Sequence, residues 1–207
     1  TKKLGVSSEI PVQPSIALGA VDITVQDMVA AYSTFANQRV YIKPQFISRI
    51  EDKNGNVLYE KIPRKVDALS EQTAYLMLYM LRGVVDKGTG LRLRGPRYRF
   101  TNPIAGKTGT TQENSDGWFI GITPDLVSGV WTGAEDRSVH FRSTNLGEGA
   151  NTALPIWALY MKKVYADATL KISKGDFTPP AGGLDVEIDC DKFKKQSSGA
   201  TNPSLDF

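Results

Sequence analysis

The sequence has 207 residues, with 25 Lys and Arg against 22 Asp and Glu, which leaves a formal net charge of +3. Hydrophobic residues make up 41% and charged residues 23%, proportions that exclude a wholly disordered, collagen-like or coiled-coil chain. No run of eighteen apolar residues predicts a membrane span, and the first residues lack an initiator Met and a signal-peptide pattern. We therefore expect one ordinary domain whose sequence begins inside a longer protein.

The composition does not indicate a metal site or a bound cofactor. The chain has one cysteine, Cys190, and one histidine, His140, whose separation fits no recognised metal-ligand spacing. A pI of about 8.9 is mildly basic and falls short of a nucleic-acid-binding signature. We expect no metal, no cofactor and no nucleic-acid partner.

The first part of the chain predicts an entry loop and then a helix. Residues 1–23 are rich in Pro, Gly and Ser, which favours a loop. Thr24 is a suitable N-cap with an acidic residue three positions later, and apolar residues recur after it at helical spacing. We expect a helix over about 25–37, which ends before the β-branched and aromatic residues 40–42.

A β-hairpin is predicted next, because Asn54-Gly55 separates two strand-like runs, residues 46–51 and 56–60. This dipeptide favours a type I′ turn, in which both central residues have positive φ. The hairpin belongs to an excursion over about 40–62, which could be a docking element or a surface feature without catalytic meaning. The second reading is favoured, because an isolated hairpin needs neighbours and could simply pack on them.

A second helix is predicted from the cap at Ser70 to Lys87-Gly88, where the glycine can adopt the left-handed cap conformation. Apolar residues cover most of the circumference of this segment. A helix of this kind is expected to be buried on all sides.

Three strands are predicted within about 103–132, and the tight turn Thr123–Asp125 makes the last two antiparallel. Glycines inside or beside these strands indicate that another element packs closely over them: Gly121, Gly129 and Gly133. The natural cover is a helix predicted from Asn151 to Val164, which can hold Pro155 in its first turn.

This order of elements predicts an α+β fold, an antiparallel sheet covered by helices. We expect residues 1–167 to form the folded domain. Residues 168–207 are rich in Lys, Gly, Pro, Ser and Asp, and we expect an extended or disordered tail there.

The stretch Gly106–Thr111, Gly-Lys-Thr-Gly-Thr-Thr, carries the strongest chemical signal. A phosphate-binding P-loop would need a glycine at position 101 and a helix after the motif, whereas the chain has Thr101 and strand-like residues. A nucleotide-binding enzyme is therefore the less favoured alternative. The other mechanism is acyl transfer by an active-site serine, in which a Lys-Thr-Gly strand borders the site.

The residue types of this strand suit a peptide's terminal carboxylate. An ammonium offers positive charge, hydroxyls donate hydrogen bonds, and a glycine allows close approach of another chain. In a pleated strand Lys107 and Gly109 point to one face and Thr108 and Thr110 to the other. A site that uses them all must therefore lie along the edge of the strand, where a backbone N–H can also stabilise an oxyanion.

Further stretches accompany this motif in a fixed order: Pro14–Gly19, Ala31–Asn37, Gly88–Gly90, Asp116–Pro124, Val130–Gly133 and Ala153–Trp157. Together they resemble the transpeptidase domain of class A, bifunctional penicillin-binding proteins. The resemblance covers about residues 4–167. It implies the C-terminal part of a penicillin-binding, serine-β-lactamase-like fold.

The resemblance implies a peptidoglycan D,D-transpeptidase, whose serine attacks the D-Ala-D-Ala end of a stem peptide and is also acylated by penicillins. It makes Lys107 the lysine of the third family motif and the Thr110 N–H a candidate oxyanion donor. Thr108 and Thr110 would contact the substrate carboxylate, Gly109 would keep the strand approachable, and Trp118 could border the groove. The implied partners are stem peptides, β-lactams and the upstream part of the same domain. The implied location is the periplasmic face of the inner membrane, with a membrane-anchored parent protein.

Two motifs of the resembled family are not found where they are needed. No Ser-x-x-Lys occurs in the sequence, and Ser143-Thr144-Asn145 spells Ser-x-Asn only after the Lys-Thr-Gly strand. The chain therefore has one wall of an active site without its nucleophile or general base. We expect it to be inactive alone, and a non-catalytic peptidoglycan-binding module remains an alternative.

Other candidate sites have simpler structural interpretations. A basic strip with aromatic neighbours, Arg92–Phe100, could bind a polyanion, but a solvated loop is favoured. Glu113 and Asp116 could suggest a glycosidase, but Asp116 is better read as holding the loop before the second strand. The three tryptophans are most simply core residues: Trp118, Trp131 and Trp157.

Overall fold

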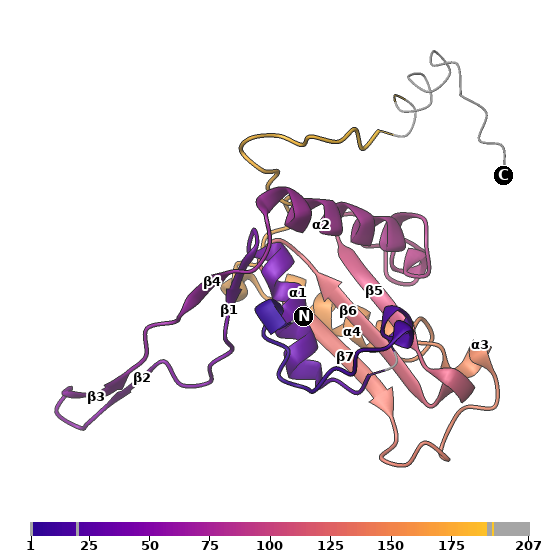
Figure 1. The fold of residues 1–207 in the computed structure, drawn as a ribbon, viewed down its shortest axis with the longest axis horizontal. Helices are drawn as coiled ribbons and strands as arrows, with labels where there is room; N and C mark the ends of the chain where they lie inside the picture. The colour runs from indigo at the N-terminus through magenta and orange to yellow at the C-terminus, as the bar shows by residue number, and fades with distance from the viewer. Residues whose placement is uncertain (1, 20, 190–191, 193–207) are drawn as a thin grey trace.

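The computed structural model describes residues 2–19, 21–189 and 192. A three-stranded antiparallel sheet occupies its centre (Figure 1). Helix α1 (Val25–Ala36) packs on one face of this sheet, and helix α4 (Ala153–Ala166) packs on the opposite face. Helix α2 (Glu71–Asp86) lies alongside one edge strand (Figure 1). The α+β prediction is confirmed.

The sheet consists of β5 (Ala105–Thr110), β6 (Asp116–Ile122) and β7 (Val127–Gly133) in that order. Each neighbouring pair is antiparallel, as the sequence predicts. The predicted turn between β6 and β7 is closed by Thr123, whose N–H donates to the Leu126 carbonyl oxygen at 2.9 Å. The motif strand β5 is therefore an edge strand of this sheet.

Close packing over two glycines fixes the helices on the sheet. A Cβ atom at Gly121 would lie 2.2 Å from the indole of Trp157 on α4. A Cβ atom at Gly129 would lie 2.7 Å from Val29 on α1. The prediction that the last helix covers all three glycines is correct for Gly121 only. Gly129 pairs with Ile120, the neighbour of Gly121, and successive residues of a strand face opposite sides of the sheet. A Cβ atom at Gly133 would meet Trp131 and Asp116 rather than α4.

Both long helices near the N-terminal end begin where the sequence predicts. Thr24 accepts a hydrogen bond from the Asp27 N–H, and Ser70 accepts one from the Thr73 N–H. The predicted left-handed glycine cap of α2 is wrong, because Gly88 has no positive φ and Lys87 forms the cap. Uniform burial of α2 is also wrong: only one stripe is buried, Ala74, Leu78, Leu81 and Val85.

Two apolar clusters hold the layers together. The larger joins α4 to the sheet and contains Trp157, whose ring contacts Phe119 edge-on at a centroid distance of 5.2 Å. The smaller joins α1 and α2 to the sheet through Phe35, Leu78 and Phe177. Because these side chains lie on both faces of the sheet, the sheet is the middle layer of the core.

Residues 40–67 form a long arm that projects from the body (Figure 1). Strand β1 (Val40–Ile42) pairs with β4 (Lys65–Asp67), and β2 (Arg49–Glu51) pairs with β3 (Val57–Glu60), both antiparallel. The predicted hairpin is thus confirmed.

The predicted type I′ turn of this hairpin is wrong. Gly55 has a φ of 83°, but Asn54 does not have a positive φ. The turn closes one residue earlier, where the Gly55 N–H donates to the Asp52 carbonyl oxygen at 3.1 Å. The Asp52 carboxylate also accepts from the Asn54 and Asn56 N–H groups, which fixes this geometry.

The remaining elements are short: η1 (Lys2–Leu4), η2 (Pro14–Leu18), η3 (Leu91–Leu93), η4 (Gln112–Asn114), α3 (Thr144–Gly147) and η5 (Ala168–Leu170). After η5, residues 171–189 form neither helix nor strand and follow α2. Asp176 pairs with Arg82 at 3.0 Å, and Phe177 is buried in the smaller cluster. The described part of the predicted tail is therefore extended and docked, whereas Cys190 and most later residues lie outside the described residues.

Candidate active site

The edge of β5 that faces away from β6 has no strand partner among the described residues and presents backbone groups as well as side chains. The Thr111 N–H donates to the Asp116 carbonyl oxygen, and Thr110 pairs with Gly117. Hydrogen-bonded and non-bonded pairs alternate along an antiparallel ladder, so the Thr110 N–H points away from β6. It has no acceptor among the described residues. An outward N–H of this kind can stabilise negative charge on a bound group.

Lys107 is exposed, in the middle of the same strand. Its ammonium donates to the Thr108 carbonyl oxygen at 2.7 Å, which holds the side chain along the edge. No carboxylate pairs with it within the described part of the chain. The charge is therefore available to an anionic ligand.

The two threonines of the motif have different environments. Thr108 is buried, and its hydroxyl oxygen lies 2.7 Å from that of Thr89 in the loop after α2. Thr110 is exposed, and its hydroxyl oxygen accepts a hydrogen bond from the Gly149 N–H at 3.1 Å. Because Gly149 occupies a lone pair, the Thr110 proton remains free to be donated.

Gly149 belongs to the connection between α3 and α4, which closes over the end of β5 and the start of β6. A Cβ atom there would lie 2.3 Å from the Trp118 carbonyl oxygen and 2.4 Å from that of Gly109. Only glycine allows this approach. Gly149 and Thr89 are not predicted as site residues from the sequence, although Thr89 lies within Gly88–Gly90, one of the stretches that carry the family resemblance.

Asp116 holds the segment between β5 and β6, as the sequence predicts. Its carboxylate accepts from the Thr111 hydroxyl at 2.8 Å, the Ser115 hydroxyl at 3.1 Å and the Trp131 indole N–H at 2.9 Å. Burial raises the pKa of Asp116, but these hydrogen bonds and the nearby Arg137 guanidinium outweigh it, so the pKa is lowered. The network anchors the strand end that carries Thr110.

The tryptophans have three different roles. Trp118 pairs with Gly109 across the ladder and is partly buried on the Lys107 face of the sheet. Trp157 is a core residue as predicted, and its N–H donates to the Ser128 hydroxyl. The core assignment of Trp131 is wrong, because this side chain is exposed and serves as a donor to Asp116.

The structure does not support two alternative interpretations, a nucleotide-binding P-loop at Lys107 and a polyanion-binding strip at Arg92–Phe100. The chain runs as a strand through Lys107 and then enters the three-residue η4, so no helix N-terminus follows as a P-loop requires. In the basic strip, Tyr98 and Phe100 are buried and cannot stack on bases. Arg94 is occupied by Asp86 and by the carbonyl oxygens of Phe100 and Asn102.

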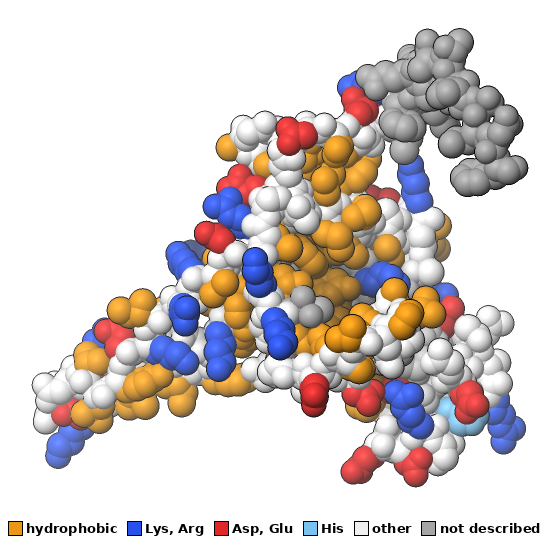
Figure 2. Space-filling view, viewed as in Figure 1, with side chains coloured by type: hydrophobic (Ala, Val, Ile, Leu, Met, Phe, Trp, Pro, Cys, Tyr) orange, Lys and Arg blue, Asp and Glu red, His pale blue; other side chains and the backbone are white. Residues whose placement is uncertain are grey.

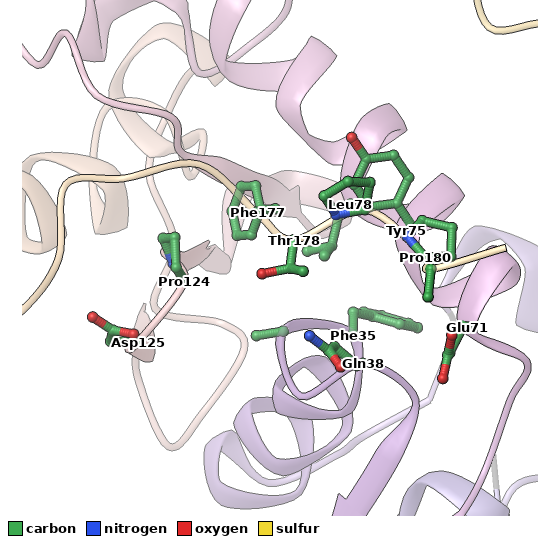
Figure 3. A pocket seen from close by; sticks show the side chains of 13 residues that line it. Phe35, Gln38, Glu71, Tyr75, Leu78, Pro124, Asp125, Phe177, Thr178 and Pro180 are labelled. Atoms are coloured by element: carbon green, nitrogen blue, oxygen red, sulfur yellow. The ribbon is translucent and has the colours of Figure 1, made fainter. Parts of the chain in front are cut away.

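A cavity of about 290 Å³ lies elsewhere, near the start of β5. Its walls come from α1, α2, the β6–β7 turn and residues 177–181, which pass between Tyr75 and Pro124 (Figure 3). None of the predicted site residues lines it.

In the described part of the chain, no helix is long and apolar enough to cross a bilayer, and no three His, Cys, Asp or Glu side chains gather as metal ligands.

The fold is that of penicillin-binding proteins. The crystal structure of penicillin-binding protein 1A from Haemophilus influenzae superposes with a TM-score of 0.71 at 24% identity, over 80% of this chain and 30% of that one. A family model, the penicillin-binding protein transpeptidase domain, matches residues 8–134. The chain belongs to this family, as the ordered motifs predict.

Curated relatives are considerably longer than this chain. Penicillin-binding protein 1A of Aquifex aeolicus is 38% identical over 190 residues, which cover 90% of this chain and 24% of the relative. Penicillin-binding protein 2D of Bacillus subtilis is 35% identical over 192 residues, covering 91% and 26%. The chain thus spans about a quarter of the length of these relatives.

Proposed function

We propose that this chain supplies the carboxylate-binding wall of a peptidoglycan D,D-transpeptidase. The observation that carries the proposal is the edge of β5: the exposed Lys107 ammonium is held along it by the Thr108 carbonyl oxygen, and the exposed Thr110, with its outward N–H, lies on the same strand. Membership in the penicillin-binding protein transpeptidase family supports the same reaction.

Each group of this edge has a defined task in the proposal. The Lys107 ammonium attracts the terminal carboxylate of a D-Ala-D-Ala stem peptide or of a β-lactam, and the Thr110 hydroxyl donates to it. The Thr110 N–H stabilises the oxyanion that forms when a serine attacks the penultimate carbonyl. Thr108 contacts the ligand from a more buried position, where its hydroxyl also forms a hydrogen bond with the Thr89 hydroxyl.

The remaining two site residues shape the groove. Gly109 keeps the strand approachable, since a Cβ atom there would already lie 3.0 Å from the Trp118 Cβ. Trp118 borders the groove on the Lys107 face. The nucleophile belongs to a Ser-x-x-Lys segment that this sequence does not contain, so we expect the chain alone to be inactive.

The whole protein would act on the periplasmic face of the inner membrane, where its substrate lies, and a membrane anchor would hold it there.

The test is acylation of the whole protein by a fluorescent penicillin. Lys107→Ala should lower the second-order acylation rate by about 100-fold, in the range known for loss of one electrostatic stabiliser. Thr110→Val should lower it by about tenfold, because the hydroxyl is lost and the N–H is kept. Lys163→Ala, at an exposed lysine on α4, is the matched control and should leave the rate unchanged.

Three outcomes would contradict parts of this proposal. An unchanged rate in Lys107→Ala would remove the lysine from the site. Covalent labelling of the chain by itself would show that it carries its own nucleophile. Binding of peptidoglycan by the whole protein without acylation would instead support the non-catalytic module.

A further inference from the structure

The arm formed by residues 40–67 is not explained by the carboxylate-binding edge. Its outer strands, β2 and β3, pair only with each other among the described residues, and they project away from the sheet (Figure 1). A two-stranded hairpin without packing neighbours is marginal in water. The arm therefore presents a surface that nothing in the described part of the chain covers.

Large apolar side chains are exposed along this arm (Figure 2). Phe46 and Ile62, between the β1–β4 and β2–β3 ladders, are 89% and 88% exposed, and Leu58 near the tip is 67% exposed. Tyr59 and its cross-strand partner Ile50 are also exposed. Because successive residues of a strand point to opposite faces, Leu58 and Tyr59 place apolar groups on both faces of the hairpin.

On the arm, the acidic side chains are engaged in ion pairs or hydrogen bonds, whereas most of the basic side chains are unpaired within the described part of the chain. Glu51 and Glu60 lie 2.5 Å and 3.7 Å from Arg49, and Asp67 pairs with Arg39. Asp52 is occupied by the turn that it closes. Among the described residues, five cations of the arm have no side-chain partner: Lys43, Lys53, Lys61, Arg64 and Lys65. The arm thus offers free positive charge beside exposed apolar groups.

We propose that this arm binds the surface of an anionic lipid bilayer. Its apolar side chains would enter the boundary between headgroups and acyl chains, while the five cations remain at the level of the lipid phosphates. This inference goes beyond the transpeptidase proposal and does not depend on it, because the arm and the β5 edge share no residues.

The arrangement fits a bilayer better than another protein. A protein that packs on one face of the hairpin would leave the apolar groups of the other face exposed, whereas lipid surrounds a thin insertion and covers apolar groups on both faces. A second copy of the arm would bring the unpaired cations of both copies together, which like-charge repulsion disfavours. An anionic lipid surface satisfies both the apolar side chains and the cations.

The experiment is co-sedimentation of the intact chain with vesicles at graded salt. We expect binding to vesicles of equal parts phosphatidylglycerol and phosphatidylcholine, weaker binding to phosphatidylcholine alone, and a partition coefficient that falls as salt rises. Sedimentation velocity without lipid, run in parallel, reports any self-association.

Substitutions at exposed positions test each component without disturbing the core. Phe46→Ser should lower the partition coefficient by about tenfold, whereas Leu18→Ser, at an equally exposed site outside the arm, should not change it. Lys53→Gln with Lys61→Gln should lower it by about 25-fold, since each surface cation contributes about 1 kcal/mol. Lys3→Gln is the corresponding control.

Several results would overturn the inference. One is no binding to the anionic vesicles at low salt. Another is binding that Phe46→Ser and Leu18→Ser reduce equally. Self-association lost in Phe46→Ser, together with absence of vesicle binding, would assign the arm to protein docking instead. None of these readouts involves acylation, so their failure is separable from that of the transpeptidase proposal.

Discussion

At the scale of single residues, the geometry of the candidate site depends on the neighbouring groups that orient Lys107 and Thr110, in addition to the residue types of the motif. The Lys107 ammonium lies along the strand because the Thr108 carbonyl oxygen accepts from it. The Thr110 hydroxyl is held in place because its oxygen accepts a hydrogen bond from the Gly149 N–H. Two backbone groups thus fix the orientation of the two side chains to which the proposal assigns the ligand carboxylate.

Gly149→Ala should disturb the site without touching its polar side chains. The new methyl would overlap the carbonyl oxygens of Trp118 and Gly109, so the loop must move away from Thr110. We expect a loss of about 1–3 kcal/mol in the free energy of unfolding and slower penicillin acylation of the whole protein. Urea denaturation and acylation kinetics measure the two effects. Gly182→Ala, where a Cβ atom meets nothing within 4 Å, is the control.

Asp116→Asn tests the anchor of the β5–β6 segment through its pH dependence. The folded pKa of Asp116 is lowered, so its carboxylate stabilises the fold above the unfolded pKa of about 3.9, and that stabilisation is lost as pH falls through the folded pKa. We expect the variant to be about 2 kcal/mol less stable at pH 7. The difference should shrink below about pH 4. A constant difference from pH 7 to pH 3 would show that the charge is not what matters.

At the scale of secondary-structure elements, replacing a glycine by alanine is expected to have opposite effects on stability in two environments. Gly83 lies inside α2, where a Cβ atom would meet nothing within 4 Å. Gly121 lies under Trp157, where a Cβ atom would overlap the indole ring. One glycine is replaceable and the other is required by packing.

Gly83→Ala should therefore stabilise the isolated chain by about 0.5–1 kcal/mol, because alanine restricts the unfolded backbone and favours helix. Gly121→Ala should destabilise it by at least about 2 kcal/mol, since Trp157 must leave its place over the sheet. Thermal unfolding of both variants provides the comparison. Equal effects of the two substitutions would refute the packing explanation.

The elements that were predicted well are those specified by local sequence. Spacing of apolar residues and the caps Thr24 and Ser70 locate α1 and α2, and the turn at Thr123 locates the β6–β7 pair. The hairpin turn type was missed because the Asp52 carboxylate captures backbone N–H groups that the Asn-Gly pattern ignores. The one-sided burial of α2 was missed because a local pattern does not specify what packs around a helix.

The same limit applies to the candidate site. Lys107, Gly109 and Thr110 could be found from the motif, because they are adjacent in sequence. Gly149 lies 39 residues beyond Thr110, and Thr89 lies 19 residues before Thr108. Contacts over such separations depend on the fold, so residue order alone does not reveal them.

At the scale of the whole molecule, the segment after α4 completes the core. Phe177 enters the cluster formed by α1, α2 and the sheet, although it belongs to a stretch without regular structure. The adjacent Asp176 pairs with Arg82 at the surface. Phe177 is the buried residue of the segment 171–189, and the partly buried Ile172 packs against the larger cluster.

Phe177→Ala should lower the free energy of unfolding by about 3–4 kcal/mol, as expected when a buried phenylalanine is truncated. Asp176→Asn, one position away, should change it by less than about 1 kcal/mol, because exposed ion pairs contribute little. Urea denaturation of both variants measures the contrast. A small effect of Phe177→Ala would mean that the tail is dispensable for the core.

The separation of the arm from the body has a consequence for sequence change. Since β2 and β3 share no ladder with the central sheet, residues can be exchanged or inserted at the tip without moving the strand that carries Lys107. The length and the side chains of this hairpin can then vary between related sequences while the core around the central sheet stays constant. The same independence makes the tip a suitable place to attach an epitope or a fluorophore.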